Sequence, residues 1–197
     1  MVKYVLASAS PRRRELLEQV GISFEVSPAG GEELSLEKSP ADIVKELSHK
    51  KACEVAKQYT GKYENDTVVI IGADTLVACE NEVMGKPLDD ADAVKMLIRL
   101  QGGIHQVYTG VTLIVIEKGV EKLKVIFHEK TEVELYPMTL ERIKAYVATG
   151  EPRDKAGAYA IPGRFAAYIK RIDGDYNTVV GLPVARLMQE LFELELA

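Results

Sequence analysis

Apolar and polar positions alternate along the chain in blocks whose length and period predict strands and helices in turn. Residues 2–7 form a largely apolar run, and residues 67–71 form a continuous run of valine and isoleucine after a threonine. Such runs are typical of strands that are covered on both faces of a sheet. The pairs Ser10–Pro11 and Ser39–Pro40 precede helical patterns and supply an N-cap residue followed by a first helical residue.

The same patterns predict further elements along the rest of the chain, separated by glycine, proline and short polar clusters. The predicted strands cover residues 2–7, 24–26, 67–71, 105–116, 120–135 and 165–172, with a hairpin over residues 76–84. The predicted helices begin near residues 10, 39, 89, 139 and 183 and end near residues 21, 59, 102, 150 and the C-terminus. This order predicts a mixed α/β fold with ligands at strand ends and the adjoining loops.

Length and charge narrow the classes of function. The 197 residues suffice for one sizeable core or two small lobes on one sheet, and we predict a single domain over residues 1–197. The net charge of −5 argues against a general nucleic-acid or membrane-surface binder, whose affinity rests on a positive field. The two cysteines form no close-spaced motif, and no apolar run predicts a signal peptide or a membrane partner. We therefore expect a cytoplasmic protein.

The turn after the first strand carries an unusual charge. Residues 8–14 read Ser-Ala-Ser-Pro-Arg-Arg-Arg, which places three arginines in the first turn of a helix. Cations at this end of the helix dipole are disfavoured by about 0.3–1 kcal/mol each at exposed sites. Free backbone N–H groups, two hydroxyls and guanidinium groups at one point are typical of a phosphate site. The alternative is that the arginines extend into solvent.

Asp74 follows the strand 67–71 directly, at the edge where open α/β sheets place their ligand crevice. A carboxylate at this edge can hold a divalent cation or accept a proton from water. The alternative is an aspartate that caps a helix or an Asx turn.

Lys51 interrupts an apolar stripe. On the helix that begins at residue 39, the stripe contains Val44, Leu47 and Val55, and Lys51 occupies the core-facing position between the last two. The lysine either extends along the helix edge to solvent or points into a cleft toward phosphate, and the pattern leaves both alternatives open.

Three loops carry further charged candidates. Lys86 and Lys155 lie in loops shaped by glycine, and Glu33 follows a pair of glycines and another glutamate. Each of these side chains either faces solvent or takes part in the site. For Glu33 that part would be as a metal ligand. The three histidines lack zinc-binding spacing, and neither a Walker motif nor a G-x-G-x-x-G fingerprint is present. Phosphate binding is therefore predicted at the serine and arginine turn.

Taken in order, seven short stretches resemble the Maf family of nucleoside-triphosphate pyrophosphatases. They are Leu6-Ala7-Ser8-Ala9-Ser10-Pro11-Arg12-Arg13, Gly72-Ala73-Asp74-Thr75, Gly85-Lys86-Pro87, His105-Gln106-Val107-Tyr108-Thr109-Gly110-Val111, Gly150-Glu151-Pro152, Asp154-Lys155-Ala156-Gly157-Ala158-Tyr159 and Gly181-Leu182-Pro183. Any one of them could arise by chance, but the ordered set over nearly the whole chain is highly specific.

The resemblance implies hydrolysis of a nucleoside triphosphate to the monophosphate and pyrophosphate with Mg²⁺ or Mn²⁺. It further implies an elongated mixed sheet flanked by helices, like that of the inosine-triphosphate pyrophosphatases, with two lobes around a cleft. Family members are often homodimers.

Matching positions imply roles for individual residues. Asp74 matches the proton acceptor, which would direct water at the α-phosphorus. The resemblance also implies substrate contacts at Ser8, Ser10, Arg13 and Lys155, catalytic roles for Lys51 and Lys86, and metal binding at Glu33 with Asp74.

Three positions relate to the base. Arg12 and Thr75 resemble the members that act on dTTP and UTP, whereas those that act on methylated GTP carry tryptophan and glutamine there. The third position is usually a glutamine, but in this chain it is Pro162, whose side chain has no donor or acceptor. One expected base contact therefore cannot form in the same way, which predicts weaker selectivity for pyrimidines.

Three alternative functions remain open from the sequence. A nucleotide- or RNA-binding regulator of cell division would keep the arginine turn but would not need Asp74, Lys86 and Lys155 together. A pyrophosphatase for methylated or other modified purine nucleotides would share the chemistry and differ in its base. An ordinary phosphatase would release orthophosphate instead of pyrophosphate.

Overall fold

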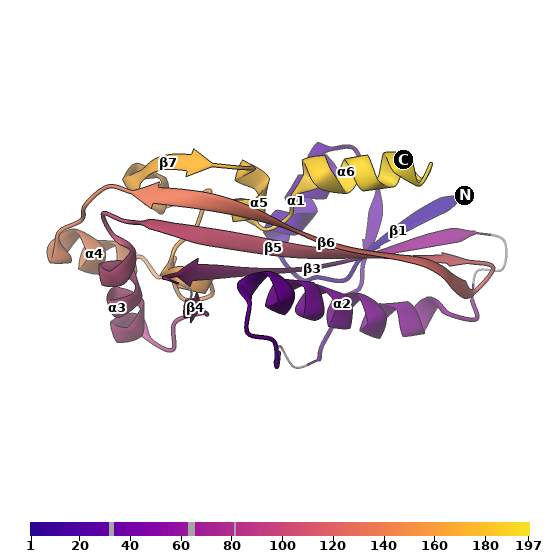
Figure 1. The fold of residues 1–197 in the computed structure, drawn as a ribbon, viewed down its shortest axis with the longest axis horizontal. Coiled ribbons are helices and arrows are strands. Elements are labelled where there is room, and N and C mark those ends of the chain that lie inside the picture. Colours follow the sequence, from indigo (N-terminus) through magenta and orange to yellow (C-terminus); the bar gives the residue numbers. More distant parts are fainter. Residues whose placement is uncertain (32–33, 63–65, 81) are drawn as a thin grey trace. The chain divides into compact units, whose positions relative to one another are not determined.

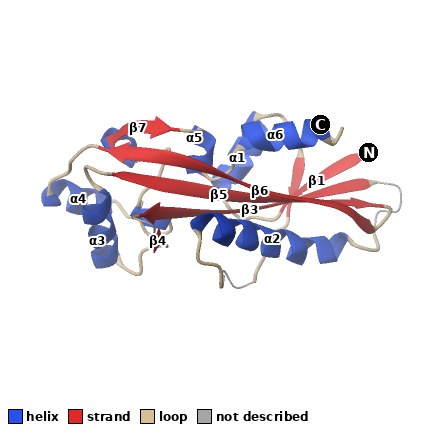
Figure 2. Ribbon diagram, viewed as in Figure 1, coloured by secondary structure: helices blue, strands red, loops and turns tan. Residues whose placement is uncertain are grey.

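Strands and helices alternate through most of the chain in a computed structural model that describes residues 1–31, 34–62, 66–80 and 82–197 (Figures 1 and 2). In chain order the elements are β1 (Val2–Leu6), α1 (Pro11–Gln19), β2 (Phe24–Val26), α2 (Pro40–Tyr59), β3 (Thr67–Cys79), β4 (Glu82–Met84), α3 (Asp90–Leu100), β5 (Ile104–Glu117), β6 (Val120–Leu135), α4 (Leu140–Val147), the 3-10 helices η1 (Ala156–Ala158) and η2 (Arg164–Tyr168), β7 (Ile169–Asp173), α5 (Tyr176–Val180) and α6 (Val184–Glu193). The predicted mixed α/β class is confirmed.

The described strands form one seven-stranded sheet in the order β2-β1-β3-β5-β6-β7, with β4 paired to β3. β1 lies between β2 and β3 and is parallel to both, with Leu6 opposite Val26 and Ile71. β4 runs antiparallel to β3, and β7 runs antiparallel to β6. Because β1 and β3 are parallel, the turn that follows β1 lies beside the part of β3 beyond Ile71.

The chain divides into two compact units. Unit 1 comprises Met1–Asp74, Thr109–Glu129 and Gly181–Ala197, and unit 2 comprises Thr75–Tyr108 and Lys130–Val180. The strands β3, β5 and β6 each contribute residues to both units. Among the helices of the described residues, none is long and apolar enough to cross a membrane.

In unit 1, α2 lies along β3 and β5, with α6 on the other side of these strands (Figure 2). The approach is close because the strands carry glycine where the helix passes. A side-chain carbon on Gly72 would overlap the carbonyl oxygen of Ser48, and one on Gly110 would overlap that of Val44. A buried hydrogen bond of 3.0 Å between the hydroxyls of Ser48 and Thr112 adds a polar contact at this interface. Helix and sheet are therefore in backbone contact in this unit.

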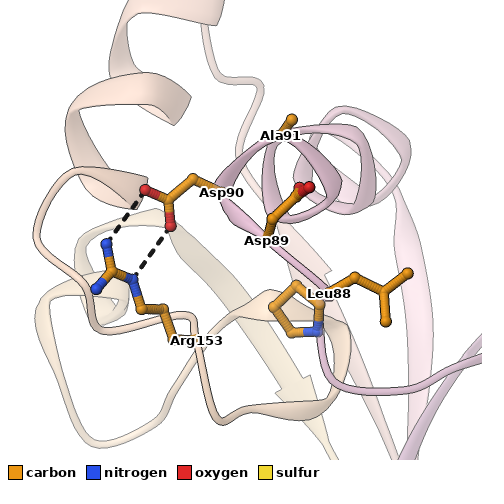
Figure 3. A pocket seen from close by; sticks show the side chains of 6 residues that line it. Leu88, Asp89, Asp90, Ala91 and Arg153 are labelled. Carbon is orange, nitrogen blue, oxygen red and sulfur yellow. Dashed lines mark hydrogen bonds and ion pairs between the residues drawn. The ribbon is translucent and has the colours of Figure 1, made fainter.

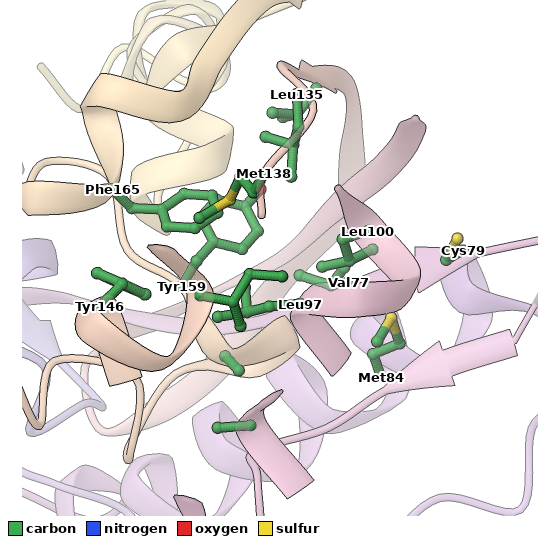
Figure 4. Close-up of a cluster of buried hydrophobic side chains, with 14 of the residues drawn as sticks. Val77, Cys79, Met84, Leu97, Leu100, Leu135, Met138, Tyr146, Tyr159 and Phe165 are labelled. Carbon is green, nitrogen blue, oxygen red and sulfur yellow. The ribbon is translucent and has the colours of Figure 1, made fainter. Parts of the chain in front are cut away.

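Unit 2 has its own aromatic core (Figure 4). Phe165 is fully buried, and its ring centroid lies 4.8 Å from those of both Tyr146 and Tyr159. Leu97 and Leu100 of α3 belong to the same cluster. This core joins α3 and α4 to the loop that carries Tyr159.

Three predicted element boundaries are wrong. The strand predicted over 67–71 continues to Cys79, because Gly72 permits the close approach of α2 and does not end the strand. The strand predicted over 165–172 is split into η2 and β7, since Phe165 turns into the core of unit 2. The last helix ends at Glu193 and is preceded by the short helix α5, which the sequence pattern did not predict.

Candidate functional site

The turn after β1 is held together by hydrogen bonds among the residues predicted to bind phosphate. The buried hydroxyl of Ser8 accepts a hydrogen bond from the Ser10 N–H at 3.2 Å and another from Arg13 Nη1 at 3.1 Å. Arg13 Nε donates to the carbonyl oxygen of Gly181 at 2.8 Å, which ties the turn to the segment before α6. Arg13 is itself buried, so the alternative that it extends into solvent is excluded.

Helix α1 begins after this turn as predicted. Ser10 occupies the N-cap position and Pro11 the first helical position, but the Ser10 side chain makes no capping hydrogen bond. That hydroxyl therefore does not occupy the N–H groups of the first turn, which is the arrangement that suits an anion. Arg12 is half-buried. Arg14 is half-buried too, because it lies three residues before the buried Leu17 on the same helix face.

Lys51 and Asp74 form an ion pair in unit 1. Lys51 Nζ lies 2.6 Å from Asp74 Oδ1, and the two side chains are only 17% and 11% exposed. Lys51 therefore does not extend along the helix edge to solvent. Asp74 lies inside β3, not at the start of a helix or in a turn, so both alternatives from the sequence are excluded. Because both side chains are largely buried, water screens this ion pair less than it screens a surface pair.

The contact between α2 and the sheet accounts for this pair. Asp74 lies two residues after Gly72 and so shares its face of β3, the face that α2 covers. Lys51 lies three residues after Ser48, within one helical turn of the point of closest approach. The parallel register of β1 and β3 places the Ser8 turn beside the same part of β3. Unit 1 thus brings together a cation, a carboxylate and the predicted phosphate turn.

Thr75 follows Asp74 directly in β3 and is half-buried. Successive side chains of a strand point to opposite faces, so Thr75 lies on the other face of the strand from Asp74.

Helix α2 also holds a loop that the sequence analysis did not connect to it. The carboxylate of Glu54 accepts hydrogen bonds from the N–H groups of Gly30 and Gly31, at 2.8 and 3.0 Å. Glu54 lies three residues after Lys51, and this helical spacing was the sequence signal that could have placed Glu54 near the site. The predicted metal ligand Glu33 lies outside the described residues.

In unit 2, the two predicted lysine loops are joined. The N–H of Gly157, two residues after Lys155, donates to the carbonyl oxygen of Gly85, the residue before Lys86, at 3.0 Å. Lys86 is exposed, whereas Lys155 is half-buried and pairs with Asp154 at 2.5 Å. The loops that carry the two lysines are therefore neighbours in this unit.

Pro162 is exposed in the same unit, while Tyr159, three residues earlier, is buried. The imidazole of the fully buried His105 forms a 2.7 Å hydrogen bond through Nε2 with the Tyr159 hydroxyl. Burial raises the pKa of Tyr159 and lowers the pKa of His105 to about 4. No role was predicted for this histidine, which ties the segment after Lys155 to β5.

We expect the burial of His105 to make stability pH-dependent. Its pKa is about 4 in the folded chain against 6.5 for an exposed imidazole, so the unfolded chain binds more protons between these values. The free energy of unfolding should therefore be highest, as far as this group is concerned, above pH 6.5. It should fall by about 2 kcal/mol by about pH 5. Urea unfolding at several pH values measures this slope. His105→Gln should reduce this slope, whereas an equal slope in His105→Gln would contradict the assignment.

A hollow of about 490 Å³ lies in unit 2 at the start of α3 (Figure 3). Its lining residues are Pro87, Leu88, Asp89, Asp90, Ala91 and Arg153. The Arg153 guanidinium is matched by the Asp90 carboxylate, with Nε 3.2 Å from Oδ1 and Nη2 3.3 Å from Oδ2. With Asp89 also in the lining, negative charge exceeds positive charge. The hollow is therefore a poor site for a triphosphate.

Comparison with known proteins supports the resemblance seen in the motifs. A relative from Agathobacter rectalis, named dTTP/UTP pyrophosphatase, is 52% identical over 98% of this chain and 98% of its own length. Relatives with the same name from Lachnoclostridium phytofermentans and Bacillus cytotoxicus are 50% and 45% identical, over 97% and 99% of this chain and 94% and 97% of their own lengths. The solved Ham1 protein of Staphylococcus aureus is similar over 98% of this chain and 99% of its own, with 14% identity and a TM-score of 0.49.

The family model described as Maf-like protein matches residues 3–194, a stretch that includes every motif of the ordered set. With that match and relatives at 45–52% identity, the chain belongs to the Maf-like protein family.

Proposed function

We propose that this chain hydrolyses dTTP and UTP to the nucleoside monophosphate and pyrophosphate. The names of its relatives, at 45–52% identity over nearly the whole chain, support this substrate class. The observation that carries the proposal is the ion pair of Lys51 with Asp74, which lies beside the hydrogen-bonded turn of Ser8, Ser10 and Arg13. Such a hydrolase requires a carboxylate that can take a proton from water and a group of donors that can bind phosphate.

In the proposed reaction, Asp74 orients a water molecule and accepts its proton as the water attacks the α-phosphorus. Lys51 holds the carboxylate through a 2.6 Å contact and so fixes the direction from which the water is presented. Pyrophosphate is the leaving group. Arg13 and the N–H groups at the start of α1 offset the charge that develops on the phosphoryl oxygens, which is positioning and electrostatic work.

We further propose that Lys86 and Lys155 act together in binding triphosphate and that residues 1–197 act as one domain. The joined loops of the two lysines support the first part. The continuous match over residues 3–194 and the strands shared by both units support the second.

A divalent cation is part of the proposal. The described residues contain no group of three or more His, Cys, Asp or Glu side chains that could hold a metal by themselves. Mg²⁺ is often held by one or two carboxylates together with substrate phosphates, and Asp74 supplies one such carboxylate, so the residues fit a cation that binds with the nucleotide. Glu33 is proposed as the second ligand. When bound, Mg²⁺ or Mn²⁺ would neutralise phosphate charge and favour deprotonation of water.

For the base, we propose contacts from Arg12, Thr75 and the segment around Pro162. Because Pro162 offers no side-chain hydrogen bond, selectivity at this segment depends on its backbone groups and on how that backbone is held. The homodimer and the cytoplasmic location stay predictions from the sequence.

A nucleotide panel tests the function. With Mg²⁺ or Mn²⁺ present, we expect pyrophosphate release from dTTP and UTP, together with the monophosphate. The assay should include dCTP, dGTP, methylated GTP and other modified triphosphates, with pyrophosphate and orthophosphate measured separately. Release of orthophosphate alone would indicate an ordinary phosphatase, and no release from any nucleotide would rule out the enzyme.

A further inference from the structure

Glu151, from the Gly150-Glu151-Pro152 motif, holds the chain immediately after Pro162. Its Oε2 accepts a hydrogen bond from the backbone N–H of Arg164 at 3.1 Å. Its Oε1 accepts one from the Tyr146 hydroxyl at 3.0 Å. A side-chain carbon on Gly163 would overlap the Glu151 carboxylate, so this group fills the space left by the missing side chain of Gly163. The turn from residue 162 to 164 is therefore fitted around one carboxylate.

The other end of the same segment is fixed independently. Tyr159 is buried in the core of unit 2 and hydrogen-bonded to His105. Between Tyr159 and Gly163 the chain passes from buried Ile161 to exposed Pro162. The segment 159–163 is thus held by β5 at its start and by Glu151 at its end.

We propose that Glu151 is a positioning residue for base selectivity, acting on the segment 159–163 and not on the triphosphate. This inference rests on the proposed function, in which that segment contacts the base. Each carboxylate oxygen already accepts a hydrogen bond from a protein donor, so Glu151 acts through the backbone it holds. A negative group is also unsuited to contact a triphosphate directly.

The type of residue at this position follows from its partners. Arg164 N–H and Tyr146 O–H are both donors, and a carboxylate offers an acceptor to each. Glutamine keeps one acceptor and places an NH₂ group where the second one was. Glu151→Gln should therefore retain part of the effect, whereas Glu151→Ala should lose it all and also open the space beside Gly163.

The test compares a nucleotide with a base-free probe. In Glu151→Ala we expect the ratio of kcat/KM for dTTP to that for dCTP to fall about tenfold, mainly through a higher KM for dTTP. Inhibition by inorganic triphosphate, which has no base, should change by less than about twofold. Glu151→Gln should lie between Glu151→Ala and the wild type. Tyr146→Phe removes only the hydroxyl that orients Oε1 and should lower the ratio in the same direction.

Glu132→Gln is the matched control, because the Glu132 carboxylate pairs with exposed Lys130. It should leave both measurements unchanged. An unchanged ratio in folded Glu151→Ala, or equal losses for dTTP and inorganic triphosphate, would overturn this inference. If Glu151→Ala does not fold, an unchanged ratio in both Glu151→Gln and Tyr146→Phe would overturn it. A wild-type chain that releases no pyrophosphate would instead overturn the proposed function.

Discussion

Asp74→Asn is expected to lower the rate of pyrophosphate release from dTTP by about 10³-fold, within the range for loss of a general base. Asparagine keeps the shape of the side chain and an oxygen that can accept from Lys51, but it cannot take a proton from water. Because the phosphate turn is unaltered, nucleotide binding should remain measurable by calorimetry. The loss should therefore be in kcat and not in affinity.

Asp66→Asn provides the control for this variant. Asp66 precedes the same strand, β3, and its carboxylate pairs with exposed Lys3 at 2.6 Å. Its replacement should leave the rate of pyrophosphate release unchanged. Wild-type turnover by Asp74→Asn would contradict the proposed catalytic role of Asp74. A lowered melting temperature together with weak nucleotide binding would show that Asp74 has a structural role instead.

Gly110→Ala is expected to lower the free energy of unfolding by about 3 kcal/mol, at the upper end of the range for overpacking. The added carbon would overlap the carbonyl oxygen of Val44, and Gly72→Ala would meet that of Ser48 in the same way. Backbone atoms inside a helix cannot move aside as a flexible side chain does. Helix α2 must then shift away from the sheet, and Lys51 shifts away from Asp74 with it. Urea unfolding and pyrophosphate release should both report the change.

Gly103→Ala is the control for the packing argument. Its nearest neighbour is the carbonyl oxygen of Leu100 at 3.6 Å, which is an ordinary contact distance. The free energy of unfolding should therefore change by no more than about 0.5 kcal/mol. Equal stability of Gly110→Ala and the wild type would contradict the close approach of α2 to the sheet.

The order of strands and helices was predictable because hydrophobic period is a local property of the chain. The starts of α1 and α2, and the whole of β6, lie where the sequence predicted them. The turn from Ser8 to Arg14 could be predicted as a candidate anion site for a related reason, since arginines at the positive end of a helix dipole indicate an anion without reference to any distant residue.

Glycines in strands show where local reasoning fails. Gly72 follows an apolar run and was interpreted as its end, because glycine in isolation is a turn residue. In the folded chain the same glycine lies inside β3, where α2 requires a position without a side chain. That requirement comes from the carbonyl of Ser48, 24 residues earlier in the chain, and leaves no trace in the local pattern.

The sequence by itself determined the class of fold and, through the ordered motifs, the family, and it predicted an anion site at the start of α1. Only the tertiary structure decided what the charged residues contact. It paired Lys51 with Asp74, buried Arg13 against Ser8 and Gly181, and placed Glu151 beside Arg164. The physical reason is that hydrophobic period and helix charge act over a few residues, whereas an ion pair or a carboxylate-held turn depends on backbones that meet only after packing.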